Sequence, residues 1–264
     1  NHLNYFWIDW NLISPKTSLS SFVEFQKINE TNMNKLNVVV TGVGGDIGYA
    51  IILALQHFEN VHVYAYSRQP EKLRKFFGDK ANITLARIDL NELTRIPESS
   101  KDLGLPERID VLINNAGFLN KKPFEAYAAA EIQHMVNVNF TGTMLFTQLC
   151  LPRMKSSPKA HIVNISSMGG VQGSVKFPGL TVYAASKAAI AGFTEVLAEE
   201  YKSTGIHVNC LALGAVKTKM FNEAFPGQQA PQMPDETAAY IVDFALNQRN
   251  FFNGKIIPLA VSTP

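Results

Sequence analysis

An apolar strand runs directly into a glycine-rich turn in the stretch Leu36-Asn-Val-Val-Val-Thr-Gly-Val-Gly-Gly-Asp-Ile-Gly48. Apolar and small residues then recur along one helical face as far as Phe58. Glycines at such a turn allow a phosphate to approach the backbone, and the start of the helix offers free N–H groups. The stretch therefore predicts the first strand, phosphate loop and first helix of an α/β nucleotide-binding fold.

The rest of the chain continues the alternation of strands and helices. Its strand-like runs are continuously apolar rather than alternating, which is typical of parallel strands covered on both faces. We therefore predict a doubly wound, Rossmann-type parallel sheet of about seven strands flanked by helices, in a single domain over residues 33–264. The predicted strands cover residues 36–41, 61–66, 83–88, 109–114, 161–165, 206–211 and 255–259.

Residues 1–32 have scattered aromatics and no sustained period. We expect an N-terminal extension outside the core, upstream of a domain that begins near Met33. The alternative is that aromatics such as Trp7 and Trp10 cover a surface or an oligomer contact.

Composition narrows the class of protein. The 264 residues are 46% hydrophobic and 17% charged, with a net charge of +2, which supports no nucleic-acid or membrane partner. Cys150 and Cys210 stand in apolar surroundings, so we expect two buried thiols in a reducing compartment, the cytoplasm. The six His are scattered without ligand spacing, and no metal site is expected.

Three motifs follow the glycine-rich turn in order: Asn114-Asn-Ala-Gly117, His161-Ile-Val-Asn-Ile-Ser-Ser167 and Tyr183-Ala-Ala-Ser-Lys187. A Tyr with a Lys four residues on is common by chance, but on a helix both lie on one face. In this order the motifs resemble the short-chain dehydrogenase/reductase family, over about residues 36–259. The resemblance implies a carbonyl reductase-like, nicotinamide-dependent oxidoreductase that forms a homodimer or homotetramer.

The cofactor side departs from the family pattern at Asp46, where the usual T-G-x-x-x-G-x-G spacing has Gly. The spacing T-G-x-x-G-x-x-G still fits, with Asp46 pointing outward or capping the first turn. Ser67 offers no ribose-binding carboxylate and Arg68 can pair with a phosphate, which favours NADP(H) over NAD(H). The alternatives are that Arg68 is a solvated loop charge and that Asp89 caps the next helix. The predicted cofactor-binding residues are Thr41, Gly42, Gly45, Ile47, Gly48, Ser67, Arg68, Asp89, Leu90, Asn115, Ala116, Gly117, Tyr183, Lys187, Gly214, Val216 and Thr218.

Carbonyl reduction needs a proton donor near the oxygen. A phenol has an ordinary pKa of about 10 and is a poor acid at neutral pH, but a nearby ammonium lowers that pKa. The resemblance assigns Tyr183 as acid/base, Lys187 as the pKa-lowering and ribose-binding group, Ser167 as the holder of the substrate oxygen, and the Asn139 backbone as the holder of a water. The competing neighbours are Ser166 and Asn137.

The loop after the sixth strand has Leu213 where the family usually has Pro, which removes a conformational restraint but no polar group. The next segment lids the substrate in the family. Met168, Phe177, Met220 and Phe221 predict a partly hydrophobic substrate pocket. The alternative is that these side chains only pack the lid onto the body.

The sequence therefore predicts an NADP(H)-dependent oxidoreductase that reduces a carbonyl, or oxidises a secondary alcohol, of a small molecule. One alternative is a 3-oxoacyl-thioester reductase, which would need basic surface for its carrier. Another is a non-catalytic NADP(H)-binding sensor or scaffold. The four predicted catalytic residues argue against this alternative, while the departures from the family pattern at Asp46 and Leu213 leave it open.

Overall fold

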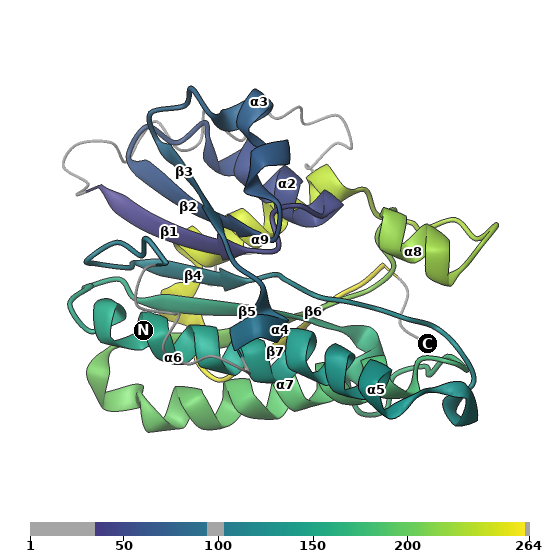
Figure 1. Cartoon of the computed structure of the whole chain (residues 1–264). Coiled ribbons are helices and arrows are strands. Elements are labelled where there is room, and N and C mark those ends of the chain that lie inside the picture. Colours follow the sequence, from purple (N-terminus) through teal and green to yellow (C-terminus); the bar gives the residue numbers. More distant parts are fainter. Residues whose placement is uncertain (1–34, 94–102, 262–264) are drawn as a thin grey trace, which may run out of the picture. The chain divides into compact units, whose positions relative to one another are not determined.

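The computed structural model describes residues 35–93 and 103–261, which belong to one compact unit, Lys35–Pro264. The expectations for residues 1–32 lie outside the described residues. Seven parallel strands form one sheet in the order β3-β2-β1-β4-β5-β6-β7, which confirms the predicted Rossmann-type fold (Figure 1). The strands are β1 (Leu36–Thr41), β2 (Val61–Ser67), β3 (Ile83–Arg87), β4 (Val111–Asn114), β5 (His161–Ser167), β6 (His207–Leu213) and β7 (Ile256–Leu259).

The strand order reverses between β1 and β4, so the carboxyl ends of these two strands form the switch point at which α/β sheets bind ligands. Two predicted strand ends fell short by two residues each. The strand predicted to end at Ile165 continues to Ser167, and the one predicted to end at Leu211 continues to Leu213, because β5 and β6 pair along their full length. This extension carries Ser167 to the edge of the sheet.

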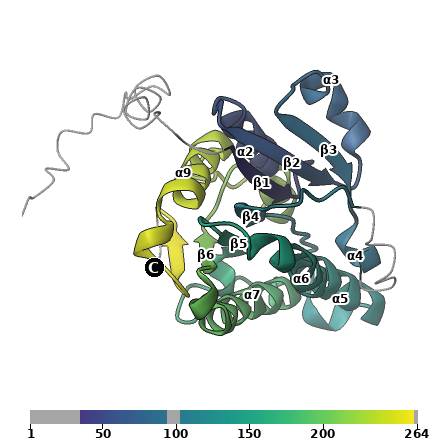
Figure 2. The same ribbon diagram turned by 90° about the vertical axis from the view of Figure 1, so that its left-hand side faces the viewer.

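Helices cover both faces of the sheet (Figure 2). Helices α2 and α9 pack together on one face, and α6 and α7 pack on the other. The helices are α2 (Asp46–Leu55), α3 (Arg74–Phe77), α4 (Leu90–Leu93), α5 (Ala129–Val136), α6 (Gly142–Met154), α7 (Thr181–Glu200), α8 (Lys219–Ala224) and α9 (Pro234–Asn247). A π-helical turn (Asn137–Thr141) joins α5 to α6, and short 3-10 turns lie at Pro70–Lys72, Phe124–Ala126, Met168–Gly170, Lys202–Thr204 and Arg249–Phe251.

The first strand shows why the strands are continuously apolar. Successive side chains of a strand point to opposite faces. Val38 and Val40 join the core cluster on the α2 and α9 side, whereas Val39 joins the cluster on the α6 and α7 side. All three are fully buried, so a polar residue at any of these positions would lie in one of the two cores.

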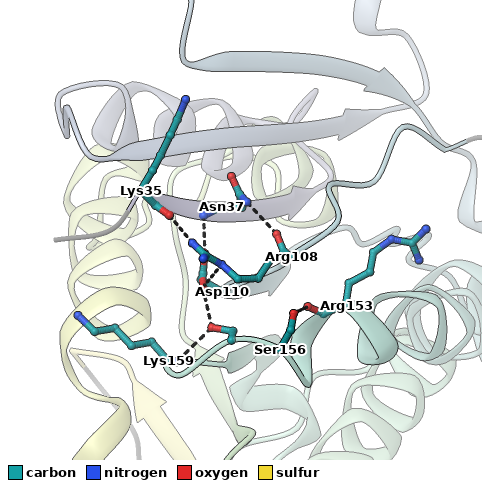
Figure 3. Close-up of polar contacts among 8 residues, drawn as sticks. Lys35, Asn37, Arg108, Asp110, Arg153, Ser156 and Lys159 are labelled. Carbon is teal, nitrogen blue, oxygen red and sulfur yellow. Dashed lines mark hydrogen bonds and ion pairs between the residues drawn. The ribbon is translucent and has the colours of Figure 1, made fainter.

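A buried carboxylate ties the sheet together at the edge opposite the switch point (Figure 3). Asp110 is 1% exposed and lies just before β4. It accepts the N–H of Asn37 at 2.8 Å and the hydroxyl of Ser157 at 2.6 Å, and it pairs with Arg108 at 3.1 Å. Arg108 also donates to the carbonyl of Lys35. These bonds fix the amino ends of the central strands and leave the carboxyl ends for a site.

Candidate active site

The phosphate loop contains two glycines that no other residue could replace without a clash. A Cβ on Gly42, whose φ is +74°, would lie 2.5 Å from the Cα of Ala116. A Cβ on Gly48 would lie 2.3 Å from the carbonyl oxygen of Gly42. Gly45 is exposed, and a Cβ there would meet only ordinary contact at 3.7 Å, so the loop is open at this point. Because the first amides of α2, up to Ile47 and Gly48, have no partner within the helix, the loop forms a cradle that fits a phosphate.

The Asn-Asn-Ala-Gly motif after β4 is hydrogen bonded to the phosphate loop. The side-chain amide of Asn115 donates to the carbonyls of Thr41 and Gly42 at 3.1 and 3.3 Å. The N–H of Ala116 donates to the hydroxyl of Thr41 at 3.2 Å. Asn115 therefore ties β4 to the phosphate loop through its side-chain amide.

Asp46 is exposed, and it does not cap the first turn of α2. The N-cap is Gly45, and Asp46 is the first residue of the helix. Its carboxylate instead accepts the backbone N–H of Lys219, at the start of α8, at 2.6 Å. Of the two roles considered for Asp46, the outward orientation is the one that the structure has.

The end of β2 borders the phosphate loop. Ser67 is buried, and its hydroxyl accepts the N–H of Gln69 at 3.0 Å. A Cβ on Gly44 would lie 3.5 Å from this hydroxyl. Arg68 is exposed, and its guanidinium makes no hydrogen bond or ion pair to the residues that the structure describes. Arg68 is thus a cation beside the cradle that has no partner among the described residues.

Asp89 and Leu90 follow β3 at the same edge. One carboxylate oxygen of Asp89 accepts the N–H of Asn91 at 2.9 Å, so Asp89 caps the start of α4, the alternative role considered for it. The side chain of Leu90 is buried in the core on the α6 side. Only the second oxygen of Asp89 and the backbone of Leu90 are left for a cofactor.

Tyr183 and Ser167 meet where β5 ends and α7 begins. The hydroxyl of Ser167 lies close enough to the phenol of Tyr183 to act on its pKa. The competing Ser166 is buried and donates to the carbonyl of Lys187 at 2.7 Å. Ser167 is therefore the serine that faces Tyr183.

Lys187 lies one turn further along α7. Its ammonium is buried, donates to the carbonyl of Ile165 at 2.9 Å and lies 5.9 Å from the centroid of the Tyr183 ring. A Cβ on Gly117 would lie 3.4 Å from this ammonium, so the glycine keeps space beside it. Tyr183 and Lys187 therefore lie on one face of α7, as the sequence predicts.

Burial shifts both acid–base groups. It raises the pKa of Tyr183, and the hydrogen bond from Ser167 acts in the opposite direction. Burial also lowers the pKa of Lys187 to about 8, with the Cys210 thiol acting against it. In the protein alone the pKa of Tyr183 is therefore raised rather than lowered as expected, because burial outweighs the effect of Ser167. At neutral pH Tyr183 keeps the proton that an acid catalyst must hold.

Asn139 stands in the π-helical turn between α5 and α6. Its side-chain oxygen accepts the N–H of Phe118 at 2.7 Å, and its amide donates to the carbonyl of Phe118 and the hydroxyl of Ser186 at 2.8 and 3.0 Å. The side chain is thus occupied, which leaves the backbone for any role in a proton relay. Asn137 is bonded instead to Gln133, at 2.7 Å.

The loop after β6 holds the three remaining residues predicted to bind the cofactor. Gly214 passes β7 so closely that a Cβ there would lie 2.7 Å from that of Ala260. Val216 is buried, and the hydroxyl of Thr218 caps α8 by accepting the N–H of Phe221 at 3.1 Å. The loop thus turns the chain from β6 into α8 at the edge that carries the site.

Three rings form an aromatic cluster, Phe177, Phe221 and Phe225. Phe225 packs against Phe177 and Phe221 with centroid distances of 5.4 and 5.2 Å. The ammonium of Lys121 lies 4.1 Å from the Phe225 centroid and donates to the carbonyl of Ala224 at 2.9 Å.

Sequence reasoning missed Lys121, although it stands only four residues after the Asn-Asn-Ala-Gly motif. Phe177 and Met220 are 49% and 36% exposed, so both have surface left for a ligand. Met168 is half-buried in the turn directly after Ser167.

The part of the chain that the structure describes contains neither a membrane-spanning helix nor a cluster of metal ligands. No helix among residues 35–93 and 103–261 is long and apolar enough to cross a membrane. Within the same residues, no group of three or more His, Cys, Asp or Glu side chains could hold a metal ion.

Known proteins share this architecture. The family model for short chain dehydrogenases matches residues 36–229. The 2-dehydro-3-deoxy-D-gluconate 5-dehydrogenase of Bacillus subtilis is 31% identical over 182 residues, which are 68% of this chain and 70% of that protein. The 3-oxoacyl-(acyl-carrier-protein) reductase FabG of Chlamydia muridarum is 29% identical over 246 residues, 87% of this chain and 97% of that protein. Among solved structures, ElxO with NADP bound is 27% identical with a TM-score of 0.71, and the match covers 85% of this chain and 96% of ElxO.

The parallel sheet, the glycine cradle at its switch point and the facing Ser167 and Tyr183 define an oxidoreductase with a nucleotide-binding fold. The chain belongs to the short-chain dehydrogenase/reductase family.

Proposed function

We propose that the protein reduces a carbonyl group of a small molecule with NADPH, or oxidises the corresponding secondary alcohol with NADP. The observation that carries this proposal is the close approach of the Ser167 hydroxyl to the Tyr183 phenol, with Lys187 buried one turn away. A bound nicotinamide would supply or accept the hydride. The side chains handle the oxygen and its proton.

Each residue has a role that follows from its contacts. The hydroxyl of Ser167 holds the substrate oxygen, and the phenol of Tyr183, which burial keeps protonated, donates the proton. The resulting phenolate is stabilised by Ser167 and by the positive charge of Lys187. By the family resemblance, Lys187 would also bind the nicotinamide ribose, and the backbone of Asn139 would hold a water that returns the proton.

The cradle supports a dinucleotide as cofactor. Gly42 and Gly48 leave room for a pyrophosphate at the start of α2. Arg68, without a partner among the described residues, suits the 2′-phosphate that distinguishes NADP from NAD. The related ElxO structure contains NADP. NAD(H) is the less favoured alternative.

A second candidate substrate is a 3-oxoacyl thioester. The relationship to the FabG reductase favours it. Lys121 and Lys176 are exposed on the loops beside the aromatic cluster, and they offer some of the basic surface that an acidic carrier would need.

We also propose that the protein assembles as a homodimer or homotetramer. Val196, 68% exposed on α7, offers apolar surface for such a contact. Analytical ultracentrifugation tests the assembly, and a monomer at micromolar concentration would contradict it.

The test of function follows NADPH oxidation against a panel of ketones, aldehydes, quinones and acyl thioesters. Turnover of a ketone or aldehyde supports the carbonyl reductase, whereas turnover of thioesters alone supports the second candidate. NADPH binding without turnover of any compound would favour the sensor or scaffold instead.

A further inference from the structure

A short segment bridges the two sides of the site. Residues 219–225, here called the strap, comprise α8 and Phe225, and they follow the loop that leaves β6 (Figure 1). The two ends of the strap are bonded to parts of the chain 173 and 103 residues away in sequence. The first end meets the phosphate loop, and the second meets the loop after β4.

The first bond is made by Asp46, which sits in the phosphate loop where the family usually has Gly. Its carboxylate accepts the first N–H of the strap, that of Lys219, at 2.6 Å. This N–H belongs to the first turn of a helix and has no partner within it. A hydrogen bond to a charged acceptor is stronger than one between neutral groups.

The second bond is made by Lys121. Its ammonium donates to the carbonyl of Ala224 at 2.9 Å and lies over the ring of Phe225. A Cβ on Gly179 would lie 3.1 Å from Cγ of Lys121, so the lysine stem is packed against the loop that leads to Tyr183. Phe177, in the same loop, contacts Phe225.

We propose that Asp46 and Lys121 are positioning residues that hold the strap closed over the site. Asp46 bonds the strap to the phosphate loop, on the cofactor side. Lys121 bonds the strap to the loop after β4, on the substrate side. Weakening either bond opens the strap, which speeds cofactor release and raises the KM for substrate while the chemistry at Tyr183 is unchanged. The inference rests on the proposed function, because it places cofactor and substrate beneath the strap.

The sign of the Asp46 effect separates this proposal from simple electrostatics. A carboxylate near a pyrophosphate repels it, so removal of the charge alone would slow cofactor release. Loss of the bond between Asp46 and the strap predicts faster cofactor release instead. Asp46→Ala should therefore release NADPH faster than the unmutated protein, whereas Asp46→Asn, which keeps an acceptor, should release it more slowly than Asp46→Ala.

The experiment measures NADPH dissociation by stopped-flow fluorescence, with excess NADP as the competitor. We expect Asp46→Ala and Lys121→Met each to accelerate release roughly tenfold. Lys121→Arg retains both the donor and the ring contact and should restore the unmutated rate. Glu223→Gln is the matched control, because it removes an exposed carboxylate from the strap without touching either bond.

A second measurement needs no cofactor. An open strap exposes the bonds after Lys217 and Lys219 to trypsin, so the two variants should be cleaved there faster than the unmutated protein and the Glu223→Gln control. Unchanged release and unchanged cleavage in both variants would overturn the strap proposal. Faster cleavage in a protein that binds no NADPH would support the strap and refute the proposed function.

Discussion

Acidification should destabilise the protein through one buried histidine, His161. The ring is fully buried in the first position of β5. Its Nδ1 donates to the carbonyl of Ala245 at 2.9 Å, so Nε2 accepts the amide of Asn209 at 3.1 Å. If His161 took up a second proton at Nε2, the side-chain amide of Asn209 could not flip to accept it. The side-chain oxygen of Asn209 already accepts the N–H of Lys255 at 3.1 Å.

Burial lowers the pKa of His161 to about 4, against an ordinary value of 6.5. Between these two values the unfolded chain takes up a proton that the folded protein refuses, so stability falls as the pH falls. At 1.36 kcal/mol per pKa unit, this loss approaches about 3 kcal/mol by pH 4.

The assay is urea unfolding at a series of pH values from 7 to 4, with the unmutated protein beside His161→Gln. The glutamine cannot be protonated, whereas the carboxylates titrate alike in both proteins. The difference in unfolding free energy between the two proteins should therefore shrink by about 3 kcal/mol on acidification. A difference that stays constant with pH would refute the reasoning.

Three further predictions follow from the contacts. Asp110→Ala leaves Arg108 and two half-buried donors without their partner and should lower the free energy of unfolding by about 3 kcal/mol in urea titrations; a loss below about 1 kcal/mol would contradict it. Arg68→Ala should weaken NADPH binding roughly ten- to hundredfold and leave NADH little changed, as measured by fluorescence titration; an equal loss for both cofactors would count against the phosphate contact. Removal of residues 1–32 should leave the melting temperature and NADPH affinity unchanged, since β1 begins at Leu36; a large drop in melting temperature would show that the segment is structural.

Patterns of local spacing allowed much of the fold and site to be predicted. Continuous apolar runs identified all seven strands, because a strand such as β1 must be apolar toward both helical layers. Spacing on a helix was enough to place Tyr183 and Lys187 on one face. The family resemblance selected Ser167 over Ser166, and in the structure Ser166 is buried and bonded to the carbonyl of Lys187.

Contacts between distant segments could not be predicted in this way. Asp46 meets Lys219 across 173 residues, and no local pattern in either segment marks the partner. Lys121 was missed because a lysine in a loop is usually solvated, and only the fold brings Ala224 beneath it. The pKa of Tyr183 was expected to be lowered by Lys187, but the sequence does not show how deeply the phenol is buried.

The central claim is that Tyr183 donates the proton in a hydride-transfer reaction. Tyr183→Phe keeps the ring and its packing on α7 but removes the hydroxyl that Ser167 contacts. With a substrate found in the NADPH panel, kcat should fall about 10²–10⁴-fold, the usual contribution of general acid–base catalysis. NADPH affinity should barely change, because the proposed ribose contact belongs to Lys187. Turnover by Tyr183→Phe at the unmutated rate would contradict the mechanism.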